Sequence, residues 1–222
     1  MPLIFPKNIF KDNLKKFPIQ HKWSDWDPYE LIKLPESETK EQLKKVSNRG
    51  ITAFSVACSE WVVFRMSNYV DDKIIYDYLE AFWVFLMGYD SAMPTETEND
   101  DWLGPIRGPI DLALMTSLNT IYLSEEGPPV QNSALSAQIA LHVLPDPKPF
   151  IIWQEKMLKR LVRYFRRKED EPTGDPVCRE VIDPSMELDE KKIEALIKGF
   201  LEKADFTNNP FLSGIKSHDG PL

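Results

Sequence analysis

The sequence contains few of the residues on which catalysis and covalent cross-linking depend. Its 222 residues include only two cysteines, three histidines and nine glycines. Two cysteines are too few for a disulfide framework, which favours a reducing, cytoplasmic compartment. The histidines His21, His142 and His218 fall in an arm, at a helix end and in a tail. Because no zinc-protease, phosphate-loop or nucleophile-elbow motif occurs, the sequence predicts a binding protein and not an enzyme.

Long apolar runs are also missing from the chain. The two most apolar stretches, 51–64 and 74–88, are interrupted by acids such as Glu60 and Asp77. Both are shorter than the ~20 apolar residues that cross a bilayer. Prolines and lysines interrupt the first 17 residues, which therefore do not resemble a secretory signal. We expect buried core helices and no membrane segment.

The two cysteines and a few scattered polar residues are the remaining candidates for chemistry. Cys58 lies on an apolar helix face and is expected in the core, whereas Cys178 lies in a polar loop where an exposed thiol is expected. An enzyme whose site is assembled from residues distant in sequence stays an open alternative. Its candidate groups are Glu60, Glu80 and His142.

Helical periodicity dominates the chain, and no convincing strand alternation appears. Short polar connections separate the apolar-periodic stretches, which is typical of antiparallel helix neighbours. The sequence therefore predicts an all-α, single-domain antiparallel bundle of six to seven helices with an irregular N-terminal arm. The expected helices cover residues 39–68 with a break near 48–50, 73–87, 110–123, 134–144, 150–168 and 189–203.

The chain divides into three parts on this interpretation. Residues 1–36 form an irregular arm that packs on the body and contains one short helix near 8–17. Trp23, Trp26 and Tyr29 are expected to pin this arm, since large aromatic side chains contribute much contact area. The helical domain is expected to span 37–212, followed by a loose tail at 213–222.

Helix starts are predicted from capping residues. Thr39 with Gln42 resembles a capping box, and Asp71 or Asp72 is placed to cap the next helix. Gly88 suits the end of that helix. Pro109 is expected at the start of the helix over 110–123, and Asn132 or Ser133 before the helix over 134–144.

Charge is unevenly distributed along the sequence. The net charge is −8, yet residues 71–130 alone contain twelve acids against two bases, Lys73 and Arg107. An uneven field steers charged partners, and an acidic surface suits a basic one. We predict that the acidic loop 96–102 and nearby acids contact a protein partner. These residues are Glu96, Glu98, Asp100, Asp101, Trp102, Asp71, Asp72, Glu125 and Glu126.

Other interpretations of the acidic loop remain open. A solubilising surface needs no partner, and carboxylates also suit Mg²⁺ or Ca²⁺. The spacing lacks the glycine and the terminal glutamate of an EF-hand loop, so we predict no metal and no cofactor. In the partner interpretation, Trp102 supplies an aromatic anchor of the kind enriched at binding hot spots.

A basic segment follows at 155–168, where seven bases accompany the single acid Glu155. A basic amphipathic helix is typical of nucleic-acid or membrane-surface binding, and a solvated face is the alternative. Because the net charge of −8 repels polyanions, we expect neither direct nucleic-acid binding nor membrane binding. A helical adaptor that docks a charged partner through 156–168 is the alternative function.

Short motifs in the last third of the chain carry a family resemblance. They are the Arg179-Glu180 pair, Asp183-Pro184 and the ending Asn209-Pro210-Phe211-Leu212. The segment from 174 to 212 resembles the C-terminal third of the immunity protein 49 family of bacterial polymorphic toxin systems. The resemblance implies a cytoplasmic, mostly helical protein that binds a cognate toxin domain and neutralises it by occluding its active site. Toxins that attack nucleic acid often present basic clefts, and an acidic face on this chain would be complementary to such a cleft.

The same motifs also have purely structural interpretations. Arg179 and Glu180 suit pairing with neighbouring elements, and Asp183 followed by proline suits a helix N-cap. Phe211 and Leu212 suit a contact that fixes the tail on the bundle. We expect these folding roles to outweigh direct contact with a toxin.

Overall fold

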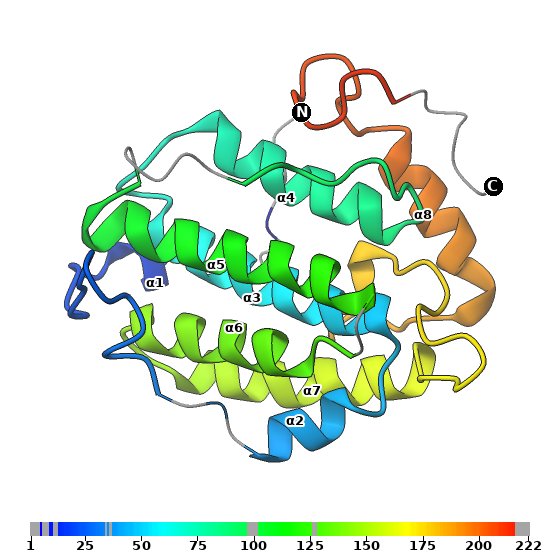
Figure 1. Ribbon diagram of the computed structural model, residues 1–222, viewed down its shortest axis with the longest axis horizontal. Coiled ribbons are helices and arrows are strands. Elements are labelled where there is room, and N and C mark those ends of the chain that lie inside the picture. The colour runs from blue at the N-terminus through cyan, green and yellow to red at the C-terminus, as the bar shows by residue number, and fades with distance from the viewer. Residues whose placement is uncertain are drawn as a thin grey trace.

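The computed structural model describes residues 5, 9–10, 13–33, 35, 37–96, 102–125 and 128–215. These residues form eight α-helices and no β-strand, which confirms the all-α prediction (Figure 1). One isolated bridge, Val46 to Arg166, is the only β-type pairing in the described part of the chain. Helix α1 (Asn13–Lys16) lies within the short helix expected near 8–17 and brings the number to eight, one more than the bundle prediction. Helix α2 (Ser37–Leu43) is the first part of the helix expected over 39–68, which is broken before Asn48 and not at 48–50.

The central element is helix α3 (Asn48–Met66), which is buried along its length except at Arg49. Most of its residues are apolar or small because it has neighbours on every face, and its ionisable residues Glu60 and Arg65 are buried as well. Figure 1 shows α3 enclosed between α4 (Lys73–Leu86) and the pair α6 (Val130–Val143) and α7 (Lys148–Tyr164). Helix α5 (Gly104–Tyr122) packs closely against both α3 and α6.

Small hydroxyl residues allow α3, α5 and α6 to approach one another. Ser55 on α3 lies 2.9 Å from the Ser117 hydroxyl on α5 and 2.6 Å from the Ser136 hydroxyl on α6. Ser59 donates to the carbonyl of Ala113 at 2.8 Å and lies 2.9 Å from Ser117. The hydroxyls satisfy one another, so their burial leaves no lost hydrogen bond at this contact.

The ends of α4 follow the predicted local chemistry. The Asp72 carboxylate accepts the N–H of Ile74 at 3.1 Å, as an N-cap side chain does. After α4, Gly88 has a φ of 104° and its N–H donates to the carbonyl of Phe85 at 2.9 Å. A left-handed residue at this position is the usual helix stop, and glycine adopts it without steric cost.

Other helix starts differ from the predictions. The capping box at Thr39 was wrong because α2 begins at Ser37, and α3 begins afresh with Ser47 as its N-cap. Helix α5 begins at Gly104 with proline in its first turn, so Pro109 lies inside it. Helix α6 begins at Val130 without a side-chain cap, because Ser133 instead donates to the α3 backbone.

Beyond α7 the chain continues in short turns. Helix α7 ends at Tyr164, several residues before the predicted Lys168, because the following residues pair with the segment before α3. The remaining elements are η2 (Leu123–Glu125), η3 (Arg179–Ile182), η4 (Glu190–Lys192) and α8 (Ile193–Leu201). The segment after α8 is fixed as well, since Asn209 and Leu212 are fully buried.

Candidate protein-interaction site

Of the acids predicted to contact a partner, the structure describes Asp71, Asp72, Glu96 and Glu125, and their surroundings differ. Asp71 and Glu96 are exposed. Asp72 caps α4 and also forms an ion pair with Arg107 at 2.8 Å, so much of its charge is balanced locally. Glu125 ends η2. The predicted contacts Glu98, Asp100, Asp101 and Glu126 lie outside the described residues.

Trp102 does not lie on the surface as an anchor would. It is 8% exposed and belongs to the hydrophobic core. The guanidinium of Arg107 lies over its ring, 5.5 Å from the centroid. The prediction that Trp102 is an exposed partner anchor is therefore wrong, because its ring is buried in the core.

The N-terminal arm instead presents exposed aromatic side chains. Trp26 is 96% exposed, Tyr29 is 51% exposed and Leu31 is 40% exposed. The expectation that Trp26 and Tyr29 pin the arm was wrong. Only Trp23 of the three aromatics packs against the core cluster. A tryptophan this exposed buries almost none of the large apolar area that its side chain usually buries on folding.

Trp23 fits because α5 has no side chain at the point of contact. The Trp23 indole lies where a Cβ of Gly108 would be, so any larger residue at 108 would collide with it. Its Nε1 donates to Asp25 at 2.8 Å. The same Asp25 oxygen accepts the N–H of Gly104 at 2.8 Å, which ties the arm to the first turn of α5.

The segment that carries Trp26 has a defined shape. Asp27 accepts the N–H groups of Tyr29 and Glu30, both at 3.1 Å, and donates its own N–H to Ser24 at 3.2 Å. Such side-chain-to-backbone bonds stabilise turns without regular secondary structure. Trp26 therefore projects from an ordered turn. The arm surface is defined here as residues 25–31.

The arm surface is acidic as well as aromatic. Asp25, Asp27 and Glu30 lie within it, and no base occurs between Lys22 and Lys33. Asp111 on α5 adds negative potential, because burial and this carboxylate together raise the pKa of Tyr29. The combination of a projecting indole and surrounding acids could not be distinguished from a pinned arm by sequence alone.

The carboxylates proposed for an assembled active site are engaged in structural contacts. Glu60 is fully buried, and its oxygens accept from Trp83 at 2.6 Å and from Arg179 at 2.7 and 3.0 Å. This contact joins α3, α4 and η3 and confirms that Arg179 pairs with a neighbouring element. Glu80 belongs instead to a separate network with Asn209 and the backbone of Asp205.

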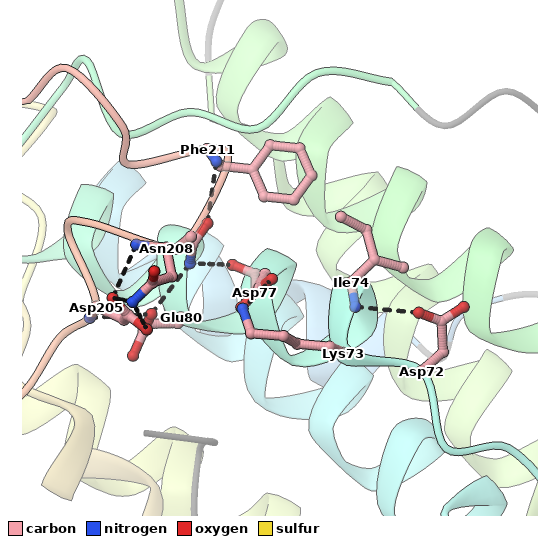
Figure 2. A network of polar contacts seen from close by, with 9 residues as sticks. Asp72, Lys73, Ile74, Asp77, Glu80, Asp205, Asn208 and Phe211 are labelled. Carbon is pink, nitrogen blue, oxygen red and sulfur yellow. Dashed lines mark hydrogen bonds and ion pairs between the residues drawn. The ribbon is translucent and has the colours of Figure 1, made fainter.

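Figure 2 shows that network, in which the C-terminal segment lies along α4. The amide of Asn209 donates to Glu80 and to the backbone carbonyl of Asp77, both at 3.0 Å, and its own oxygen accepts the N–H of Phe211 at 3.0 Å. The Phe211 ring packs on Tyr78 with centroids 4.3 Å apart. The motif ending at Leu212 thus has the predicted folding role.

The remaining motif contacts are also internal. Asp183 does not cap a helix as expected. It follows η3, and its carboxylate accepts the N–H of Ser185 at 2.9 Å. Burial is the main cause of a raised pKa at Glu180. These groups shape the turn between η3 and η4.

Neither thiol is placed for reaction. Cys58 is in the core as predicted, and burial raises its pKa well above the ordinary value. Cys178 is fully buried, so the expected exposed thiol was wrong. Burial, with a smaller effect of Glu180, raises the pKa of Cys178 to about 12. A thiol with so high a pKa contains almost no nucleophilic thiolate at neutral pH.

Two histidines come together although the sequence placed them in different contexts. The rings of His21 on the arm and His142 on α6 have centroids 5.6 Å apart. His218 lies outside the described residues. Within the described ranges no group of three or more histidine, cysteine or acidic residues is arranged to hold a metal ion.

The basic segment is partly used for folding. Arg160 donates to the backbone carbonyls of Val181, Met186 and Glu180 at 3.1, 2.6 and 3.0 Å. Arg167 donates to the Asn48 side chain at 2.7 Å. Lys156, Lys159, Arg163 and Arg166 are exposed, so a smaller basic surface than predicted remains.

Comparison with known proteins adds no relative. Searches of protein-family models, curated proteins and solved structures all returned no match. Among the described helices, none combines the length and the apolar character that a bilayer crossing requires. The resemblance of 174–212 to immunity proteins stays a prediction from its short motifs.

Proposed function

We propose that this chain is a non-catalytic immunity protein of the cytoplasm that binds a cognate toxin domain and occludes its active site. The observation that carries this proposal is Trp26, which is 96% exposed on an ordered acidic turn. Tryptophan is among the residues most enriched at binding hot spots. The motif resemblance supports the toxin as the partner class.

The arm surface suits a basic partner with an apolar pocket. Trp26 supplies an anchor at the centre, and the flanking carboxylates of Asp25 and Asp27 favour approach of positive charge. Because the turn is already held by hydrogen bonds, little conformational entropy is lost on binding. A toxin that acts on nucleic acid has a basic cleft that would fit this description.

Trp26→Ala tests the anchor directly. Truncation of a hot-spot residue costs about 2 kcal/mol or more, which raises the Kd about 30-fold. Ile152→Ala is the matched control, because Ile152 is 56% exposed on α7 and outside the arm surface. The tagged chain is first used to capture its partner from the source cells, and the Kd of each variant is then measured by calorimetry.

A growth assay links binding to immunity. Expression of the captured partner alone should stop growth of a host strain, and co-expression of the wild-type chain or Ile152→Ala should restore growth. Trp26→Ala should restore it poorly. A partner that is harmless to the host, or one bound equally well by Trp26→Ala, would refute the proposal.

The adaptor alternative rests on the exposed bases of α7. Lys156, Lys159 and Arg163 are exposed, and Ile151 and Ile152 lie on the same helix at 42% and 56% exposure. An acidic partner would suit such a face. Replacing the three bases by glutamate would then abolish capture, whereas Trp26→Ala would leave it unchanged.

A further inference from the structure

The base of the arm is held by side chains that donate to backbone carbonyls. His21 Nε2 lies 2.8 Å from the carbonyl oxygen of Pro105, and His142 Nε2 lies 2.7 Å from that of Lys22. Arg65 Nη2 donates to the carbonyl of Pro18 at 3.0 Å. The three contacts connect the arm to α5, α6 and α3. In the sequence, the arm residues of these contacts lie between α1 and the arm surface.

The His21 contact exists because of a proline inside α5. Pro109 has no N–H, so the Pro105 carbonyl four residues earlier lacks its helical donor. His21 supplies that donor from the arm. Since a carbonyl only accepts, Nε2 must carry the proton in both rings, and a neutral His21 then has an unprotonated Nδ1.

The surroundings of His21 disfavour a second proton. Its Nδ1 is buried without a hydrogen-bond partner. The charged and titratable groups that act on this ring are His142 from α6 and Arg65 from α3, while α5 contributes only the Pro105 carbonyl. Arg65 is 1% exposed, and its Nε and Nη1 are also buried without partners. Asp25, on the arm, accepts from Trp23 and Gly104.

We propose that His21, packed against His142, is a pH-sensitive latch, which holds the arm on the bundle when the His21 ring is neutral and releases the arm when that ring is protonated. Protonation of His21 would place its positive charge near the buried Arg65, and the new Nδ1–H of His21 would have no acceptor. Movement of the arm into water relieves both costs. The latch rests on the proposed function in one respect. Release of the arm would displace the arm surface, which is proposed to bind the toxin.

The direction of the linkage follows from His21. Burial, His142 and Arg65 lower the pKa of His21, and only the Pro105 hydrogen bond opposes them. The released arm therefore binds a proton more readily than the docked arm. Docking is fully favoured above the ordinary histidine pKa of about 6.5 and weakens as the pH falls below it. One linked proton changes the opening equilibrium by up to about tenfold per pH unit.

Hydrogen exchange of the whole chain tests the latch without any partner. Protection of amides in 13–33 is compared at pH 7.5 and pH 5.5 after correction for the intrinsic pH dependence of exchange. We expect protection of the arm to fall by up to about tenfold, whereas protection of α3 stays unchanged. Far-UV circular dichroism at both pH values confirms that the bundle remains folded.

Two variants separate the latch from a general acid effect. His21→Gln keeps an N–H donor near the Pro105 carbonyl and removes the titrating ring, so the pH dependence of arm exchange should shrink to less than about twofold. His142→Gln leaves His21 in place and should keep most of the pH dependence, because burial is the main cause of the lowered pKa of His21. Equal protection of the wild-type arm at both pH values would overturn the latch. Retention of the full wild-type pH dependence in His21→Gln would overturn it as well.

Failure of the latch and failure of the proposed function give different results. Exchange is measured on the free chain and depends on the histidines alone, while immunity is tested at pH 7.5 with Trp26→Ala. A chain with no pH-dependent arm motion that still protects against a toxin would refute only the latch. A chain with the pH response but no toxic partner would refute only the immunity function.

Discussion

Replacement of Glu60 is the sharpest test of the physical account of this fold. The Glu60 carboxylate is fully buried and accepts three hydrogen bonds, one from Trp83 and two from Arg179. Glu60→Gln preserves the shape of the side chain and removes its charge. Arg179, whose side chain is 12% exposed, then loses the buried carboxylate that balances it.

The expected loss of stability in Glu60→Gln follows from the type of contact that is broken, a buried ion pair. Removing one partner of a buried ion pair costs about 3–5 kcal/mol, because the other charge is left in a poorly solvated site. With a urea m-value of about 2 kcal/mol/M, the unfolding midpoint should fall by about 1.5–2.5 M. Trp83→Phe removes one charge-assisted hydrogen bond and should cost less, about 1.5–3 kcal/mol.

A double-mutant cycle identifies the source of the loss. Glu60→Met combined with Arg179→Met removes both charges and should be far milder than the sum of the single changes, with a coupling free energy of at least about 2 kcal/mol. Urea titrations followed by far-UV circular dichroism measure all four proteins. A midpoint shift below about 0.5 M for Glu60→Gln, or additive single effects, would refute the reasoning.

Three further predictions concern other contacts. Asn209→Ala should lower stability by about 2–3 kcal/mol, because a buried amide with three hydrogen bonds is lost. The same change should expose 205–215 to protease, and unchanged proteolysis would contradict this prediction. Cys178 should not react with a thiol reagent in the native state at pH 7.5, since the pKa is about 12, and should react on unfolding. Arg160→Lys should cost about 1–3 kcal/mol, whereas the exposed neighbour Lys159→Ala should stay within about 0.5 kcal/mol in the same urea titration.

Features that depend on neighbouring residues were predictable from the sequence. Asp72 caps α4 through an N–H only two residues away, and Gly88 ends the same helix within one turn. The helical class followed from periodicity that needs no tertiary information. These contacts are local, so their chemistry is visible in a short window.

Features that depend on distant residues were not predictable. Trp23 and Trp26 occupy similar sequence contexts, yet only Trp23 faces Gly108 on α5. Cys178 is buried because the polar segment around it folds onto the bundle, and the Arg179–Glu60 pair joins residues 119 positions apart. The sequence contained one signal of a distant contact. Pro109 has no N–H, so the Pro105 carbonyl lacks its helical donor, and His21 occupies that position.

The enclosure of α3 has a consequence for synthesis on the ribosome. Helix α3 is complete at Met66, but its neighbours α5, α6 and α7 are complete only at Tyr164. At about 5–20 residues per second, nearly a hundred residues take roughly 5–20 s to emerge. During that interval α3 is covered only by α4 and by those of the other three helices that have already emerged. Nascent chains that stop after α4 should therefore bind chaperones or aggregate, and the covering helices should rescue solubility only when all three are present.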